Sequence, residues 1–243
     1  MQPDIKAIFL DVGNTLRIVI EDPEFSKAAK DEMLRLLNVT EPPEEFFAAL
    51  EIRWKAYRKE AKVNLLEASE RDLWSKHLLP QYPIKQIAPI AGKLTRLWRD
   101  KDGRRVPRED VKETLIELDK RGYLLGIIAN TITETEIPDW MLEDEVSHYF
   151  KAVVLSSRLG IRKPDPDIYR LAAHQVGVAP EECAYVGDNP VRDVEGARAA
   201  HFGMMILIHE PATLAKEPPT GEHKVDYTIT ALKELLDIFP ARQ

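Results

Sequence analysis

Short apolar runs alternate along this chain with longer stretches in which apolar residues recur at helical spacing. Residues 7–10, 124–129, 152–155, 184–186 and 204–208 are mainly apolar and lack polar alternation, which is the pattern of strands buried on both faces. Helical periodicity or a glycine- or proline-containing turn separates each run from the next. This alternation predicts an α/β fold with a doubly wound parallel sheet.

A different pattern fills residues 22–102, where apolar residues recur at helical spacing among many charges and prolines interrupt the series. It predicts several helices inserted after the first strand. We therefore expect an α/β core made of residues 1–18 and 104–243, and an all-helical domain over residues 19–103. Near the end of the chain, residues 210–223 are polar and contain prolines, which predicts a surface loop.

The residues that could carry chemistry lie at the ends of the predicted strands, where doubly wound sheets gather their ligands. They are Asp11, Asn130, Thr131, Lys163, Asp188 and Asp193. A carboxylate can attack an anionic phosphate ester only if nearby cations offset the repulsion. A magnesium ion held by carboxylates and a main-chain carbonyl, together with a lysine ammonium, would do so.

Three segments resemble the motifs of the haloacid dehalogenase-like superfamily. Ile-Phe-Leu-Asp-Val-Gly-Asn-Thr-Leu over 8–16 resembles its nucleophile motif. Gly-Ile-Arg-Lys-Pro-Asp-Pro-Asp-Ile-Tyr over 160–169 resembles its lysine motif, and Val-Gly-Asp-Asn-Pro-Val-Arg-Asp over 186–193 its metal-binding motif. Each piece alone is common in turns, but the three in this order span nearly the whole chain. The resemblance implies a Rossmann-like core and a mobile helical cap over 19–103.

The resemblance also implies a role for each residue. Asp11 would attack phosphorus and form an aspartyl-phosphate. Mg²⁺ would bind Asp11, the carbonyl of Gly13 and Asp188, with Asp193 positioning the ion through water or through another ligand. Lys163 would steady Asp11 and the phosphoryl group.

The phosphoryl oxygens would be held by Lys163 and, after the second strand, by Asn130 or Thr131. The superfamily usually places Ser or Thr at this strand end, and here that position is Ala129 unless Thr131 is the true equivalent. A second departure is Gly13, which stands where most phosphatases of the superfamily have a second Asp. That Asp protonates the leaving group, and a missing general acid costs on the order of 10²–10⁴ in rate.

These departures leave alternatives open. The main hypothesis is a phosphatase for a small phosphorylated metabolite, biased toward good leaving groups, with Glu21 or Asp22 as a weak substitute for the acid. The second hypothesis is a binding or regulatory protein that keeps the fold without useful turnover. A metal-free haloacid dehalogenase is a third, and a phosphonate hydrolase would need a cap lysine, for which Lys55, Lys59 and Lys62 are equivalent in the sequence.

Composition narrows the class of protein further. The chain has 243 residues and a net charge of -7, which argues against a nucleic-acid partner. Its one cysteine, Cys183, rules out an internal disulfide framework and fits a reducing compartment. No apolar run approaches the roughly 18 residues of a membrane span, and the N-terminus lacks a signal-peptide pattern. We therefore expect a cytoplasmic protein without a membrane partner, and the sequence leaves its oligomeric state open.

Overall fold

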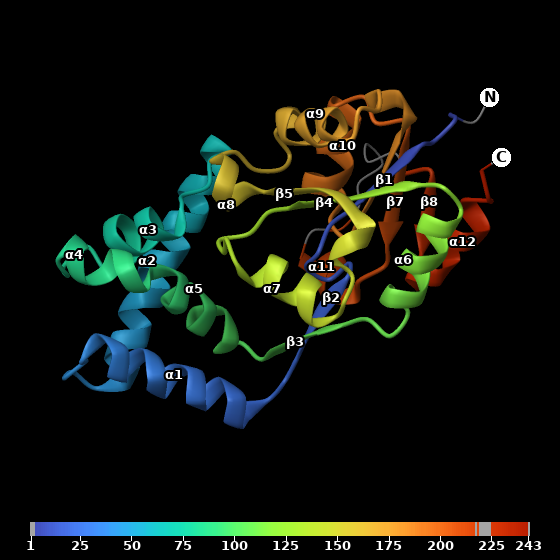
Figure 1. The fold of residues 1–243 in the computed structure, drawn as a ribbon. Helices are drawn as coiled ribbons and strands as arrows, with labels where there is room; N and C mark the ends of the chain where they lie inside the picture. Colours follow the sequence, from blue (N-terminus) through green and yellow to red (C-terminus); the bar gives the residue numbers. More distant parts are fainter. Residues whose placement is uncertain (1–2, 217, 219–224, 243) are drawn as a thin grey trace.

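The computed structural model describes residues 3–216, 218 and 225–242 of the chain. Within these residues a six-stranded sheet has the order β5–β4–β1–β6–β7–β8, and every neighbouring pair is parallel (Figure 1). The strands are β1 Ala7–Leu10, β4 Leu124–Ala129, β5 Phe150–Leu155, β6 Cys183–Gly187, β7 Met204–Ile208 and β8 Tyr227–Ile229. The predicted α/β class with a parallel sheet is confirmed.

Helices cover both faces of this sheet because successive side chains of a strand point to opposite sides. Ile8 and Leu10 of β1 belong to one hydrophobic cluster, and Ala7 and Phe9 belong to another. The first cluster includes residues of α6 Val111–Lys120, α7 Glu136–Glu143 and α12 Leu235–Ile238. The second includes residues of α9 Pro166–Gln175 and α10 Gly196–Ala199. The side chain of Asp165 caps the start of α9, and a proline stands in its first turn.

The predicted helices between the first two strands of the sheet form a separate block, on the left of Figure 1. They are α1 Pro23–Leu37, α2 Pro43–Asn64, α3 Glu70–Asp72, α4 Ile84–Ile87 and α5 Ala91–Asp100. We call α1–α5 the helical block. Its hydrophobic cluster includes Trp74 and Trp98, whose rings meet edge to face with centroids 6.3 Å apart. None of the described helices has both the length and the hydrophobicity to cross a lipid bilayer.

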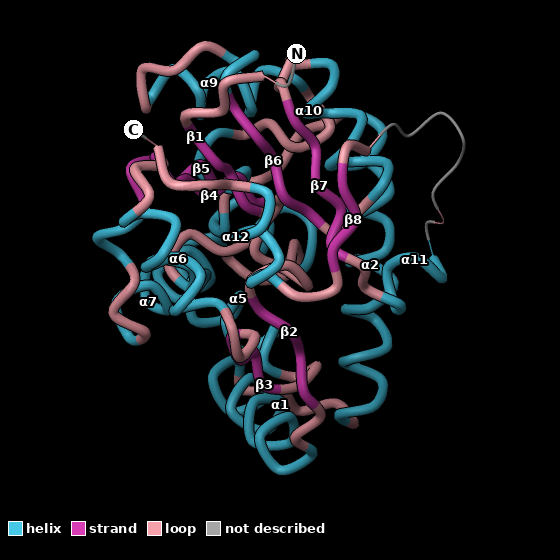
Figure 2. The backbone as a smooth tube through the Cα atoms, turned by 90° about the vertical axis from the view of Figure 1, so that its right-hand side faces the viewer, coloured by secondary structure: helices cyan, strands magenta, loops and turns pink. Residues whose placement is uncertain are grey.

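Two short strands that the sequence did not reveal join the helical block to the sheet. β2 Arg17–Ile20 and β3 Arg104–Pro107 pair antiparallel, and Figure 2 shows them between the block and the sheet. Both are four residues long and at most partly buried, so neither shows the apolar run of a core strand. The predicted boundary after residue 18 therefore falls inside β2.

A loop of the helical block is hydrogen-bonded to the segment that precedes Lys163. The amide of Glu67 donates to the carbonyl of Gly160 at 2.9 Å, and the amide of Arg162 donates to the carbonyl of Leu65 at 3.1 Å. Gly160 directly follows the short helix α8 Ser156–Leu159. The Glu67 carboxylate also lies 3.2 Å from the Arg162 guanidinium in a buried ion pair. We call these contacts the 65–67/160–162 junction.

The polar stretch predicted as a surface loop over 210–223 is partly helical. Residues 211–216 form α11 Pro211–Lys216, which begins with proline, a residue favoured in the first helical turn. Residues 217 and 219–223 lie outside the described part of the chain. The prediction of a loop was thus wrong for 211–216, because a six-residue helix is too short to show a clear period.

Candidate active site

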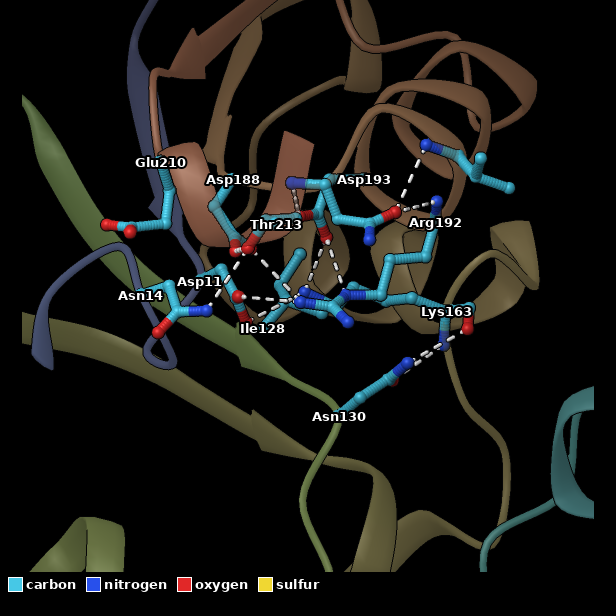
Figure 3. Close-up of polar contacts among 12 residues, drawn as sticks. Asp11, Asn14, Ile128, Asn130, Lys163, Asp188, Arg192, Asp193, Glu210 and Thr213 are labelled. Carbon is cyan, nitrogen blue, oxygen red and sulfur yellow. Dashed lines mark hydrogen bonds and ion pairs between the residues drawn. The ribbon is translucent and has the colours of Figure 1, made fainter. Parts of the chain in front are cut away.

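Four side chains from distant segments meet at the carboxyl edge of the sheet (Figure 3). Asp11 directly follows β1, and Asp188 directly follows β6. Asp193 lies in a π-helical segment, Pro190–Glu195, and Lys163 lies in the loop between α8 and α9. All four are buried, with at most 3% of the residue exposed. The parallel register explains this meeting, since adjacent parallel strands end at the same edge.

Lys163 connects two of the acids. Its ammonium nitrogen lies 2.9 Å from Oδ1 of Asp11 and 2.7 Å from Oδ1 of Asp193. It also donates to the hydroxyl of Tyr185 at 2.6 Å, and that hydroxyl donates to the carbonyl of Ile128 at 3.0 Å. The ammonium has three donors, and three acceptors surround it. The lysine is therefore fixed beside Asp11 by buried contacts.

The carboxylates of Asp11, Asp188 and Asp193 offer ligand oxygens that all lie within 4.8 Å of one another. Arg192 contacts the three, at 3.0 Å from Asp188, 3.7 Å from Asp11 and 3.8 Å from Asp193. Burial, and then the charges of Asp11 and Asp193, raise the pKa of Asp188 to about 6. Three carboxylates thus face two cations, Lys163 and Arg192. An all-oxygen donor set with this charge fits a hard divalent cation such as Mg²⁺.

The geometry around Asp193 explains the Gly-Asp pair at the end of β6. The main-chain amide of Asn189 donates to Oδ2 of Asp193 at 3.0 Å. A Cβ atom added to Gly187 would lie 2.5 Å from the same oxygen, which is too close for a real contact. Only glycine at this position lets the Asp193 carboxylate approach the strand.

Thr213 is a site residue that sequence reasoning missed. Its hydroxyl donates to Oδ2 of Asp188 at 2.5 Å and accepts from the side-chain amide of Asn14 at 3.2 Å. Thr213 lies on α11, so the final part of the chain reaches the carboxylates (Figure 3). Nothing in the polar stretch around it distinguishes this threonine from an exposed one.

Comparison with known proteins decides the family. The model of a family described as haloacid dehalogenase-like hydrolases matches residues 5–201. That range contains Asp11, Lys163, Asp188 and Asp193. The chain belongs to the haloacid dehalogenase-like hydrolases.

Individual relatives of this hydrolase agree with the family match. The phosphoserine phosphatase of Thermus thermophilus is 30% identical over 227 residues, covering 81% of this chain and 86% of the relative. The structure of a HAD phosphatase from Thermococcus onnurineus covers 98% of this chain, and this chain covers 99% of it, with a TM-score of 0.61 and 22% identity. A 2-haloacid dehalogenase from Pseudomonas syringae reaches 0.70 with 21% identity, at 96% and 97% coverage. Structural likeness at this identity shows the fold alone.

Two positions of this hydrolase lack the side chains that the resemblance leads one to expect. Gly13 is exposed, and a Cβ added there would meet nothing within 4 Å. Ala129 ends β4 with a buried methyl group. At position 13 the chain thus has the space for a side chain but no side chain, and at position 129 it has no hydroxyl.

Asn130 and Thr131, the predicted phosphate-binding residues, are engaged with the backbone. The side chain of Asn130 donates to the carbonyl of Lys163 at 2.9 Å and accepts from its amide at 2.8 Å. The Thr131 hydroxyl accepts from the amide of Thr133 at 3.1 Å. Asn130 thus ties the end of β4 to the lysine loop, and Thr131 stabilises its own turn. Their predicted contact with phosphate stays a prediction.

The two acids suggested as substitutes for the missing proton donor lie at the start of α1. Asp22 accepts from the amide of Phe25 at 3.0 Å and pairs with Arg104 at 2.9 Å. Glu21 is exposed. Among the described contacts, neither acid touches Asp11. Asp22 serves as a helix cap in an ion pair, which leaves no structural support for a catalytic role.

Proposed function

We propose that this hydrolase is a magnesium-dependent phosphatase that acts on a small phosphorylated metabolite through an aspartyl-phosphate on Asp11. The observation that carries the proposal is the buried contact of Lys163 with both Asp11 and Asp193, beside a third carboxylate, Asp188. This arrangement combines a nucleophile with the positive charge that its attack on an anion needs.

The proposed reaction has two steps. An oxygen of Asp11 forms a bond to phosphorus while the bond to the leaving oxygen breaks, and water then hydrolyses the aspartyl-phosphate to release phosphate. Lys163 holds Asp11 in place and offsets charge on the phosphoryl oxygens. Bound to Asp11, Asp188 and Asp193, with the Gly13 carbonyl as a further ligand, Mg²⁺ would supply additional positive charge at the same point.

The absence of an acid at Gly13 shapes the expected substrate range. The leaving oxygen must take its proton from water, so good leaving groups such as aryl or acyl phosphates should react faster than alkyl phosphates. Breakdown of the aspartyl-phosphate should also be slow, because no side chain at position 13 can activate the water.

We further propose that residues 19–103 act as a mobile cap over a core formed by 1–18 and 104–243. Apart from Ile132, the hydrophobic cluster of the helical block is made of residues between β2 and β3, and these paired strands are the two chain connections of the block to the sheet. Two adjacent connections allow a block to rotate as a unit about one line. A cap of this kind would exclude water from the site during phosphoryl transfer.

A panel of phosphate esters with and without Mg²⁺ tests the proposed function. We expect magnesium-dependent release of phosphate, fastest from aryl and acyl phosphates. Asp11→Asn should lower the rate on the order of 10⁴-fold, because the amide is a poor nucleophile. Activity that survives Asp11→Asn belongs to another site, and equal rates for alkyl and aryl esters would contradict the missing-acid argument.

The residues at positions 13 and 129 favour a second candidate, a binding or regulatory protein without useful turnover. It predicts that no ester in the panel is hydrolysed while Mg²⁺ still raises the melting temperature. The dehalogenase alternative predicts halide release from a 2-haloacid without metal, which the same assays would detect.

A further inference from the structure

A cavity of about 190 Å³ lies between the end of α2 and the lysine loop. Its lining combines cationic and apolar residues. The charged lining residues are Lys62, Arg162, Lys163 and Arg192, and Leu65 and Val191 provide apolar surface. No acidic residue belongs to this described lining. A cavity lined by cations and apolar groups suits an organic anion.

Arg162 is the most deeply buried arginine of this group, with 3% of the residue exposed. Its Nη1 lies 3.2 Å from the Glu67 carboxylate, yet the geometry leaves that nitrogen without a hydrogen bond. A buried N–H without an acceptor costs free energy. An anion in the cavity would offer the missing acceptor.

Arg58 adds positive charge to the same region. Burial lowers its pKa, and the charges of Arg162 and Arg192 lower it further, although Glu67 opposes them. Among the described residues Arg58 lies over the ring of Trp54, 5.3 Å from its centroid, and forms no ion pair. Arg58 thus adds a positive charge that has no ion-pair partner among the described residues, and an incoming anion would supply one.

The cavity adjoins the proposed point of phosphoryl transfer. Lys163 lines it, and the ammonium of Lys163 lies 2.9 Å from Asp11. Arg192 lines it as well and contacts Asp188. A substrate whose phosphate lies at Asp11 can therefore extend its remaining atoms past these two residues toward α2.

We propose that this cavity is a second anion subsite, which binds a carboxylate of the substrate, so that the substrate class is phosphate esters of small carboxylic acids. This inference rests on the proposed function, since it assigns the phosphate of the same substrate to Asp11. The planar guanidinium of Arg162 can pair with a carboxylate through two parallel hydrogen bonds. The apolar surface of Leu65 and Val191 would contact the carbon atoms.

Two ligands that differ in one group test the subsite. 3-Phosphoglycerate carries a carboxylate where glycerol 3-phosphate carries a hydroxymethyl group, and the phosphate ester is otherwise the same. We expect the magnesium-loaded enzyme to hydrolyse the first with a kcat/KM about tenfold higher, as one charged hydrogen-bonded contact implies. Calorimetry with Asp11→Asn should show the same preference in the dissociation constants without turnover.

Matched variants on α2 test whether the preference for 3-phosphoglycerate arises at the cavity. Lys62 and Lys59 are exposed lysines three residues apart, but only Lys62 lines the cavity. Lys62→Gln should reduce the preference for 3-phosphoglycerate roughly fivefold, and Lys59→Gln should leave it unchanged. Arg58→Gln should reduce the preference as well. Lys62 and Lys59 are exposed, so these two variants are expected to fold.

The outcomes separate the two proposals. Equal affinity of Asp11→Asn for the two ligands would overturn the subsite, even if the wild-type enzyme hydrolyses both. An equal loss of preference in Lys59→Gln and Lys62→Gln would overturn it too, because the effect would then come from net charge. Tighter binding of 3-phosphoglycerate without hydrolysis of any ester would keep the subsite and refute the proposed phosphatase.

Discussion

On one side of Asp11, Lys163 and Asp193 form a buried group in which the ammonium contacts oxygens of Asp11, Asp193 and Tyr185. On the other side, Gly13 and Ala129 present no polar side chain. In the proposed reaction the first side would serve attack on phosphorus, and the second is where a proton donor and a phosphate-binding hydroxyl are expected. Attack on phosphorus and protonation of the leaving group would therefore depend on different residues of this site.

The difference between the two sides has a physical basis. Removing one member of a buried charge group leaves the others uncompensated, at a cost of roughly 3–5 kcal/mol. Gly13 is exposed and open, so an acid there could be lost without cost to the fold. A substitution at Lys163 or Asp193 would therefore destabilise the fold, whereas a substitution at position 13 would not.

Among the changes that compare the two sides of Asp11, the largest effect is expected on the side that is complete. Removing divalent metal with EDTA should lower phosphatase activity on the order of 10³-fold, because three carboxylates would then repel the substrate and each other. Added Mg²⁺ should restore the rate. Asp188→Asn, which removes one proposed ligand, should raise the Mg²⁺ concentration needed for half-maximal activity. Full activity in EDTA would show that Lys163 and Arg192 are sufficient without a metal.

The next effect concerns the incomplete side. Gly13→Asp should raise hydrolysis of alkyl phosphates on the order of 10²-fold by restoring a proton donor. Aryl phosphates should gain much less, since their leaving groups need no proton. The added Cβ meets nothing within 4 Å, so the variant is expected to fold.

Gly13→Asn is the matched control for this gain, because it has the same size and no carboxyl proton. Similar rates for Gly13→Asp and Gly13→Asn would mean that bulk, and not proton donation, is what the position lacks. A missing proton donor would then not distinguish the two sides of Asp11.

The smallest effect is expected at the end of β4. Ala129→Ser should lower KM or raise kcat about tenfold in total, the value of one hydrogen bond to a charged oxygen. Ala129→Cys adds a group of similar size with a weaker donor and should gain little. An unchanged rate for Ala129→Ser would indicate that main-chain amides already bind the phosphoryl oxygens.

Sequence alone predicted the parallel sheet and the residues at its carboxyl edge. Its core strands are continuous apolar runs, and parallel topology then forces the residues after β1 and β6 to one edge. Asp11 and Asp188 could therefore be placed together without coordinates. The same logic failed for β2 and β3, which are short and only partly buried.

Contacts between segments without a local pattern could not be predicted. Thr213 reaches Asp188 from a polar stretch, and no periodicity marks it. The side chain of Asn130 hydrogen-bonds to the main chain of Lys163, a residue 33 positions away, and no pattern in the sequence indicates this contact. Arg192 precedes Asp193 in the recognised motif, yet its contact with the three carboxylates depends on the π-helical turn that aims it.

The 65–67/160–162 junction has a consequence for the order of events in a catalytic cycle. The proposed cap cannot swing away from the sheet without breaking the hydrogen bonds at Gly160 and Arg162, and Arg162 is joined directly to Lys163. Entry of substrate and exit of product would each disturb the backbone that carries the ammonium. Lys163 would reach its position beside Asp11 only in the last step of cap closure. The active site would therefore be complete only after the cap has excluded bulk water.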